Sequence, residues 1–270
     1  MEKQTGNQSR LWATILFVIM LVVNMSAALF PINGMKTQDI SQKYETLFAP
    51  AGVTFAIWSV IYLLLAAFLV YQWMAKARVS AVITNRQLLN KVNWAFSISS
   101  ILNCLWLFTW QFEYLLISTI LMLGLVGSLF YLNYLLRTIP FDKKEYVLIR
   151  LPFSVYFGWI TVATIANISA TIVQQEIPLF MKDQPFWTNA ALVIGLVVAV
   201  SIIIDNRNIA YGLAVIWGYL GVLLKHESAS GWDQRYPSII TTTIISLILL
   251  VIACIFVAVR NMKRRKKALI

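Results

Sequence analysis

Apolar residues form long stretches along this chain, and short polar segments separate them. The stretches do not alternate apolar and polar residues with a period of two, which is the pattern of a half-buried strand. Most reach the length of about 20 residues that a helix needs to cross the hydrocarbon core of a bilayer. The pattern therefore predicts eight membrane-spanning helices, over about residues 11–30, 52–75, 89–110, 114–136, 146–173, 188–204, 208–225 and 237–260.

The composition supports a membrane protein. Hydrophobic residues make up 60% of the 270 residues and charged residues only 12%, whereas soluble domains are about 25% charged. Because lipid offers the backbone no hydrogen-bond partners, only helices and closed barrels span a bilayer. We therefore expect an all-α integral membrane protein whose surroundings are membrane lipid.

The net charge of +11 follows the predicted spans. If the N-terminus is cytoplasmic, one side of the membrane holds 17 of the 22 Lys and Arg residues and the other side holds 5. Such an excess of positive charge is typical of the cytoplasmic side. We predict a multi-pass protein of the cell membrane with both termini cytoplasmic, a basic cytoplasmic tail over 261–270, and no nucleic-acid partner.

The first 30 residues have a second interpretation. Lys3 and Arg10, an apolar stretch and the small residues Ser26-Ala27-Ala28 have the order of a cleavable signal peptide. An uncleaved first span is favoured because it completes an even number of helices and fits the charge pattern. Whether residues 1–30 are ever cleaved stays open.

The first outer loop, residues 31–50, is much longer than the second, which has three residues. Long loops in compact bundles are often lids or binding elements. We predict a lid over 31–50. Its polar residues also allow a short capped helix, the structural alternative: Thr37, Asp39 and Ser41.

Three predicted helices each carry aromatic and hydrogen-bonding residues on one face. On the fifth, spacings of three, four and four join Tyr156, Trp159, Ala163 and Asn167. Residues at these spacings share a helix face. The third helix has Asn103 and Trp106 on one face, and the second has Trp58 and Tyr62.

Two interpretations of these faces remain. They could be contacts between helices, where an Asn hydrogen-bonds a neighbour. They could instead line one shared aromatic pocket with a few polar groups, as a small-molecule site requires. We favour the pocket because three helices repeat the pattern. Single tryptophans near span ends are interpreted as membrane-interface anchors: Trp12, Trp73, Trp94 and Trp187.

Residues for acid–base, metal or ion-coupled chemistry are scarce. The 11 acidic residues fall in loops or at span ends, whereas ion-coupled transporters keep ionisable groups inside the membrane. Cys104 and Cys254 lie in different predicted spans, and His226 is the one histidine, so we expect neither a disulfide framework nor a metal site. We expect no catalytic residues.

These residues resemble the motifs of the tryptophan-rich sensory protein or translocator protein family (TspO/MBR). Its second helix follows a proline turn and carries Trp and Tyr four residues apart, as do Pro50, Trp58 and Tyr62. Its third helix carries Asn and, three residues later, Trp, as at Asn103 and Trp106. Its fifth helix carries Tyr-x-x-Trp, then Ala and Asn at fixed spacing, a pattern reproduced by Tyr156, Trp159, Ala163 and Asn167.

The resemblance implies a TspO-like five-helix bundle over residues 1–173, with a pocket open toward the loop 31–50. The further helices over 174–260 make the chain an elongated relative. Members of the family bind porphyrins, haem-like tetrapyrroles, sterols and synthetic aromatic compounds, and transport, sensing and tetrapyrrole degradation have been proposed for it.

The sequence thus predicts a sensor or carrier that binds a hydrophobic, planar ligand, either tetrapyrrole or sterol-like. No cofactor is expected; porphyrin or haem would enter as the ligand. The alternatives are the permease subunit of an exporter and a membrane enzyme that degrades tetrapyrroles with light or tryptophan chemistry. A homodimer is left open. Ala214, Gly218 and Gly221 form a small-residue face, for which we predict close packing on another helix.

Overall fold

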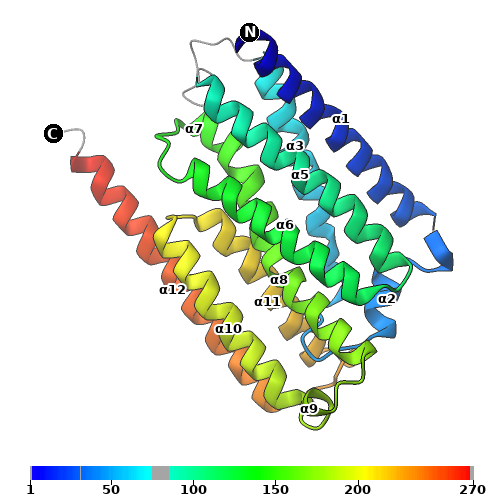
Figure 1. Cartoon of the computed structure of the whole chain (residues 1–270). Coiled ribbons are helices and arrows are strands. Elements are labelled where there is room, and N and C mark those ends of the chain that lie inside the picture. The colour runs from blue at the N-terminus through cyan, green and yellow to red at the C-terminus, as the bar shows by residue number, and fades with distance from the viewer. Residues whose placement is uncertain (1, 31, 75–84, 268–270) are drawn as a thin grey trace. The chain divides into compact units, whose positions relative to one another are not determined.

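The computed structural model describes residues 2–30, 32–74 and 85–267 of the chain (Figure 1). Within these ranges every regular element is helical, which confirms the all-α class. Pro31 of the predicted lid loop and residues 268–270 of the predicted tail lie outside the described residues. Among the described residues, eight helical stretches are long and apolar enough to cross a membrane, as predicted: Asn7–Leu29, Gly52–Met74, Arg86–Gln111, Leu115–Leu136, Lys143–Gln174, Gln184–Asp205, Ile209–Glu227 and Pro237–Lys263.

The chain forms two compact units. Unit 1 comprises Met1–Lys43 and Ile57–Phe157, and unit 2 comprises Tyr44–Ala56 and Gly158–Ile270. The boundary falls inside one helix and also takes the second half of the long first loop into unit 2. The predicted division at residue 173 was drawn from family motifs, and it stays a prediction.

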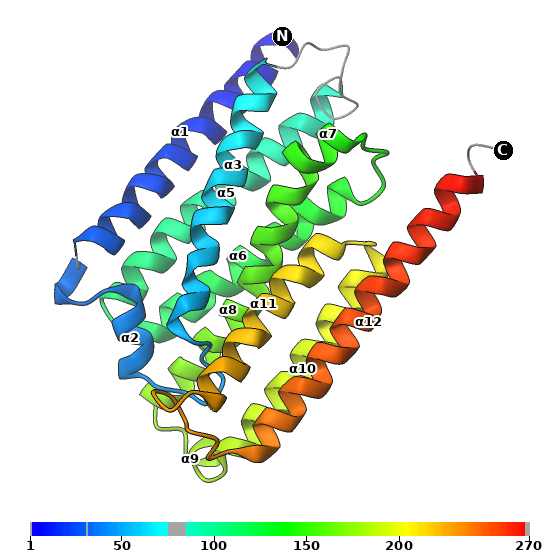
Figure 2. The ribbon, with the colours of Figure 1, turned by 180° about the vertical axis from the view of Figure 1, so that it is seen from behind.

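Unit 1 is a bundle of long helices with short accessory turns. α5 lies between α1 and α6 and packs along both, as Figures 1 and 2 show. A π-helical turn, η3, leads directly into α8, whose first residues complete the unit. The elements are α1 (Glu2–Leu29), η1 (Ile32–Gly34), α2 (Thr37–Lys43), α3 (Ile57–Met74), α5 (Arg86–Gln111), α6 (Leu115–Leu136), α7 (Lys143–Glu145), η3 (Tyr146–Arg150) and the start of α8 (Leu151–Gln174).

Aromatic rings and one amide join the helices of unit 1. Phe68 of α3 meets Phe96 of α5 and Phe153 of α8 edge to face, with ring centroids 6.1 and 4.8 Å away. The Asn133 side chain of α6 donates a 3.0 Å hydrogen bond to the Phe153 carbonyl. Edge-to-face pairs add to the burial of the rings, so this aromatic layer fixes how α3, α5 and α8 meet.

The first half of the long loop is fastened to the end of α5. The Trp110 indole N–H donates to the Thr37 carbonyl over 3.1 Å, and the Gln111 amide lies 2.9 Å from the Thr37 hydroxyl. Lys43 forms a salt bridge with Glu113. The structure also contains a short helix in this loop, α2, as its polar residues allow.

Unit 2 consists of the segment Tyr44–Ala56, the remainder of α8 and four later helices. α10, α11 and α12 pack against one another, and both views show them together (Figures 1 and 2). The predicted sixth span begins four residues earlier than expected, because α10 starts at Gln184 rather than at residue 188. The elements are η2 (Gly52–Ala56), α9 (Pro178–Met181), α10 (Gln184–Asp205), α11 (Ile209–Glu227) and α12 (Pro237–Lys267).

The small-residue face of α11 packs closely, as predicted. A Cβ atom added at Gly218 would lie 2.7 Å from a methyl carbon of Val162 on α8. A Cβ at Gly221 would lie 2.8 Å from the Pro50 Cβ. Real Cβ atoms do not approach this closely, so both positions require glycine. The turn before the second span therefore rests on α11.

Four polar contacts hold the segment 44–56 along α11. The Ala51 N–H donates to the Gly221 carbonyl over 2.9 Å, and the Trp217 indole N–H donates to the Thr54 carbonyl over 3.0 Å. Near the end of α11, His226 Nε2 lies 2.8 Å from the Leu47 carbonyl. A 2.9 Å salt bridge joins Lys225 to Glu45. The segment 44–56 is thus bound along the C-terminal half of α11.

We expect Gly218→Ala to lower the melting temperature of the purified protein, because its Cβ would overlap Val162 at a cost of about 1–3 kcal/mol. The matched control is Gly127→Ala on α6, where no described atom lies within 4 Å of the Cβ position. That change should leave stability unchanged or raise it, because Ala favours helices by up to about 1 kcal/mol. Adding Val162→Ala should restore part of the stability that Gly218→Ala removes. Equal melting temperatures for the two glycine variants would contradict the close contact.

Candidate functional site

Trp58 lies at the centre of an aromatic cluster in unit 1. Its ring stacks on Tyr62 of the same helix, with centroids 5.6 Å apart and planes 20° apart. It stacks in the same way on Trp106 of α5, at 6.3 Å and 26°. The ring of Tyr156, from α8, meets it edge-on at 5.9 Å. Three helices therefore meet at one tryptophan.

Helical spacing explains the two stacked columns. Trp58 and Tyr62 lie four residues apart on α3, so their rings fall one above the other. Trp106 and Trp110 have the same spacing on α5, and their centroids lie 6.1 Å apart. Together these rings form an aromatic cluster of five residues: Trp58, Tyr62, Trp106, Trp110 and Tyr156.

A chain of two hydrogen bonds, from Asn24 through Asn103 to Tyr156, holds one side of the cluster in place. The Asn24 side chain of α1 donates to Asn103 Oδ1 over 2.7 Å, and Asn103 Nδ2 donates to the Tyr156 hydroxyl over 3.0 Å. Asn103 and Tyr156 are fully buried. Because a buried polar group is costly unless it is paired, each partner limits where the next can lie. This hydrogen-bond chain therefore fixes the Tyr156 ring against Trp58.

One hydrogen-bond donor of the cluster, the Trp106 indole N–H, is still available to a ligand. The Trp106 side chain is 6% exposed, and its indole N–H has no hydrogen-bond partner among the described residues. A buried donor left without a partner costs about 1–3 kcal/mol, which an incoming acceptor would recover. Trp58 and Tyr62 are only half-buried, so the cluster has an accessible edge.

The other three predicted site residues belong to unit 2. Trp159 is almost fully buried and meets Phe55 of η2 edge-on, with centroids 5.9 Å apart. Asn167 is also buried, and its backbone carbonyl accepts a 3.0 Å hydrogen bond from the Thr171 hydroxyl. Ala163, between them on α8, is half-buried. The structure thus brings together Trp58, Tyr62, Asn103, Trp106 and Tyr156 within unit 1, and the remaining three residues belong to unit 2.

Two contributors to this geometry were not among the predicted site residues. Asn24 begins the hydrogen-bond chain, and a lone amide inside an apolar span was the signal for it. Phe55 is the ring that packs on Trp159. It precedes α3 in the turn, where helical spacing does not indicate which way a side chain points.

The family comparison covers almost the whole chain. A family model described as TSPO-like protein matches residues 10–256. The chain belongs to this family. The match continues beyond residue 173 and takes in α10, α11 and most of α12, so the later helices fall within the family's pattern as well. No curated protein and no solved structure matches the chain.

We expect Tyr156→Phe to destabilise unit 1, because Asn103 would lose the acceptor of a fully buried hydrogen bond. Measured hydrogen bonds inside membrane proteins suggest a loss of about 0.6–2 kcal/mol. Thermal unfolding of the purified protein measures it. The control is Tyr131→Phe, since Tyr131 lies on α6 with 46% of its surface exposed, and should change stability by less than about 0.5 kcal/mol. The same stability for both variants would contradict a supporting role for the hydrogen-bond chain.

Proposed function

We propose that this TSPO-like membrane protein binds a hydrophobic, planar small molecule at the aromatic cluster and acts as a sensor or carrier. The observation that supports this most is the arrangement around Trp58, where stacked rings from α3 and α5 lie beside the buried, unpartnered N–H of Trp106. Flat rings favour flat ligands, because stacked pairs gain about 0.5–1.5 kcal/mol beyond the burial of their area.

The same arrangement favours one class of ligand. A tetrapyrrole presents two aromatic faces for stacking, and its carbonyl or carboxylate groups could accept from Trp106. A sterol has no aromatic face and would gain from burial alone. The proposed ligand is therefore a planar tetrapyrrole such as a porphyrin or haem, bound as a ligand rather than as a cofactor.

We propose binding without a chemical step. The side chains of the cluster are indoles and phenols, its supporting residues are amides, and none of these groups is a general base near neutral pH. A tetrapyrrole-degrading enzyme would instead use the indoles in light-driven or redox chemistry. Absorption spectra of the bound ligand, compared in light and darkness, separate the two: an unchanged ligand supports binding, and light-dependent bleaching that requires the cluster supports an enzyme.

The proposal places the protein in the cell membrane with both termini cytoplasmic. In unit 2, the starts of α10 and α12 are joined by the hydrogen bond from Asn189 to Ser238, so these helices run in the same direction. Their far ends carry positive charge, at Arg207 after α10 and at Arg260 in α12. Under the positive-inside rule that end is cytoplasmic.

Trp58→Ala tests the proposed function. Loss of an anchoring aromatic residue should cost about 2 kcal/mol of binding free energy or more, which is roughly a thirtyfold loss of affinity. Titration of detergent-purified protein with protoporphyrin IX, followed by the absorption of the porphyrin, measures the affinity.

The control for this titration is Trp94→Ala. Trp94 lies on α5, as Trp106 does, but it is 49% exposed and is not part of the aromatic cluster. The Trp94→Ala variant should bind the porphyrin with wild-type affinity. If Trp58→Ala stays folded and binds as tightly as Trp94→Ala, the aromatic cluster is not the binding site.

A further inference from the structure

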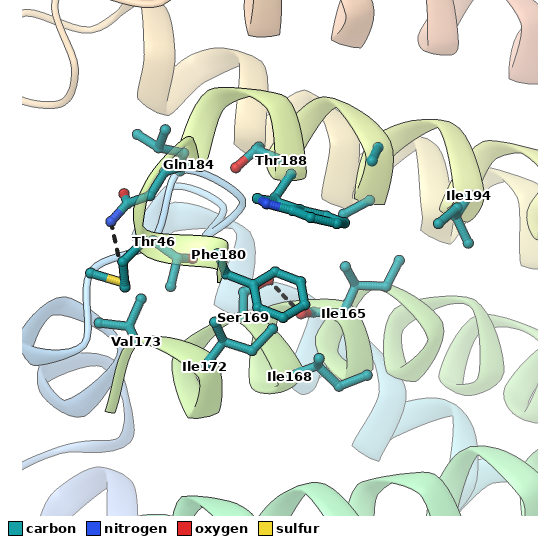
Figure 3. Close-up of a pocket in the computed structure, with 15 residues that line it drawn as sticks. Thr46, Ile165, Ile168, Ser169, Ile172, Val173, Phe180, Gln184, Thr188 and Ile194 are labelled. Carbon is teal, nitrogen blue, oxygen red and sulfur yellow. Dashed lines mark hydrogen bonds between the residues drawn. The ribbon is translucent and has the colours of Figure 1, made fainter. Parts of the chain in front are cut away.

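Unit 2 contains a cavity of about 250 Å³ between α8 and α10. Figure 3 shows Ile165, Ile168 and Ile172 on the α8 side, with Thr188 and Ile194 on the α10 side. Thr46, from the segment 44–56, also lines it. All of the elements around the cavity belong to the same unit.

The cavity lies on a different face of α8 from the predicted site residues. Ile165, Ile168 and Ile172 follow helical spacings of three and four. They are rotated away from the column of Trp159, Ala163 and Asn167, because Ile165 comes two residues, or about 200°, after Ala163 at 3.6 residues per turn. The cavity is therefore separate from the predicted column, and no residue of the aromatic cluster lines it.

Aromatic side chains cover the cavity at the α9 end. Trp187 of α10 packs on Phe180 of α9, with centroids 4.6 Å apart. Its indole N–H donates a 3.0 Å hydrogen bond to the Leu179 carbonyl. Both rings line the cavity, so the hydrogen bond holds α9 in place as its cover. Trp187, which the sequence suggested was an interface anchor, has this second role.

The lining is mainly apolar, with polar side chains at Thr46, Ser169, Gln184 and Thr188. No Lys, Arg, Asp or Glu is among the described residues that line it. The Ser169 hydroxyl already donates to the Ile165 carbonyl over 2.9 Å, and Thr46 accepts from the Ala49 N–H over 3.1 Å. Thr188 differs from both. Its side chain is 8% exposed, and it makes no hydrogen bond to any described residue.

The volume limits the size of an occupant. A cavity of about 150 Å³ holds benzene, and pockets for drug-sized ligands begin at about 300 Å³. The cavity lies between these values, so it suits one or two fused rings and is too small for a tetrapyrrole. Ile194, which lines it, is 63% exposed. Because Ile194 is ten residues into the span of α10, about 15 Å along the helix, this edge opens toward lipid.

From this combination we propose a second binding site, between α8 and α10, for a small neutral amphiphile of one or two fused rings with one hydrogen-bonding group. The rings lie against the α8 isoleucines and under Phe180 and Trp187. The hydrogen-bonding group pairs with the Thr188 hydroxyl. The ligand enters from the membrane past Ile194. This site is additional to the proposed tetrapyrrole site and does not depend on it.

The test uses the full-length protein in lipid nanodiscs, with radiolabelled 1-naphthol and naphthalene as probes. Both have two fused rings, and only 1-naphthol has a hydroxyl group. Binding is measured by equilibrium dialysis and corrected with empty nanodiscs. We expect 1-naphthol to bind saturably with a stoichiometry of one and more tightly than naphthalene.

Two variants and a control locate the site. Ala191→Phe fills the cavity, since Ala191 lines it, and should weaken 1-naphthol binding at least about tenfold, because no space of this size remains. Thr188→Val keeps the shape and removes the hydroxyl, so it should weaken 1-naphthol about fivefold to tenfold and leave naphthalene within about twofold. Val193→Phe adds the same ring as Ala191→Phe on an exposed face of α10 and should change neither affinity.

The outcomes separate the proposal from its rivals. Non-saturable uptake of 1-naphthol, as for partition into lipid, overturns it. Equal binding by wild type and folded Ala191→Phe also overturns it, and so does equal loss of both probes in Thr188→Val, which would indicate a purely apolar space for acyl chains. Melting temperatures recorded alongside show that each variant is folded. If Ala191→Phe does not fold, Thr188→Val tests the proposed site on its own, because valine has nearly the same shape as threonine.

Discussion

Helices in a bilayer gain little by exchanging lipid for protein contacts, because lipid tails are as apolar as the side chains that they would replace. Association therefore depends on close approach of small residues and on polar groups that pair across helices. Unit 2 uses the first means, at Gly218 and Gly221 of α11. Unit 1 uses the second, in the chain from Asn24 through Asn103 to Tyr156.

The hydrogen-bond chain also determines what the aromatic cluster can do. Because Asn103 holds the Tyr156 hydroxyl, the Tyr156 ring cannot turn away from Trp58 without breaking a buried hydrogen bond. Trp58 and Tyr62, in contrast, are only half-buried. The Tyr156 ring is thus the fixed side of the cluster, against which the proposed ligand would bind.

Hydropathy and helical spacing predicted the eight spans and most of the aromatic cluster. The spans follow because lipid excludes polar backbone almost irrespective of packing. Trp58, Tyr62, Asn103, Trp106 and Tyr156 could be predicted because they repeat at helical spacing and match the motifs of a known family. Trp159 shares that spacing with Tyr156, yet its ring packs on Phe55. Spacing shows which residues share a face but not what lies opposite that face.

The cavity of unit 2 shows the same limit of prediction from helical spacing. The sequence does not show whether Ile165 and Ile168 face lipid or another part of the protein, because apolar residues of a membrane span can do either. Only the fold of α9, with Phe180 under Trp187, turns that face into the wall of a cavity. A short helix that begins with a proline in a polar loop carries no periodicity that could reveal it.

The most direct test of the central claim is an experimental structure of the protein with protoporphyrin IX bound. The account predicts the macrocycle stacked against the rings of Trp58 and Trp106, with one of its oxygen atoms within hydrogen-bonding distance of the Trp106 indole nitrogen. A porphyrin bound elsewhere, with the aromatic cluster packed as it is here, would contradict it.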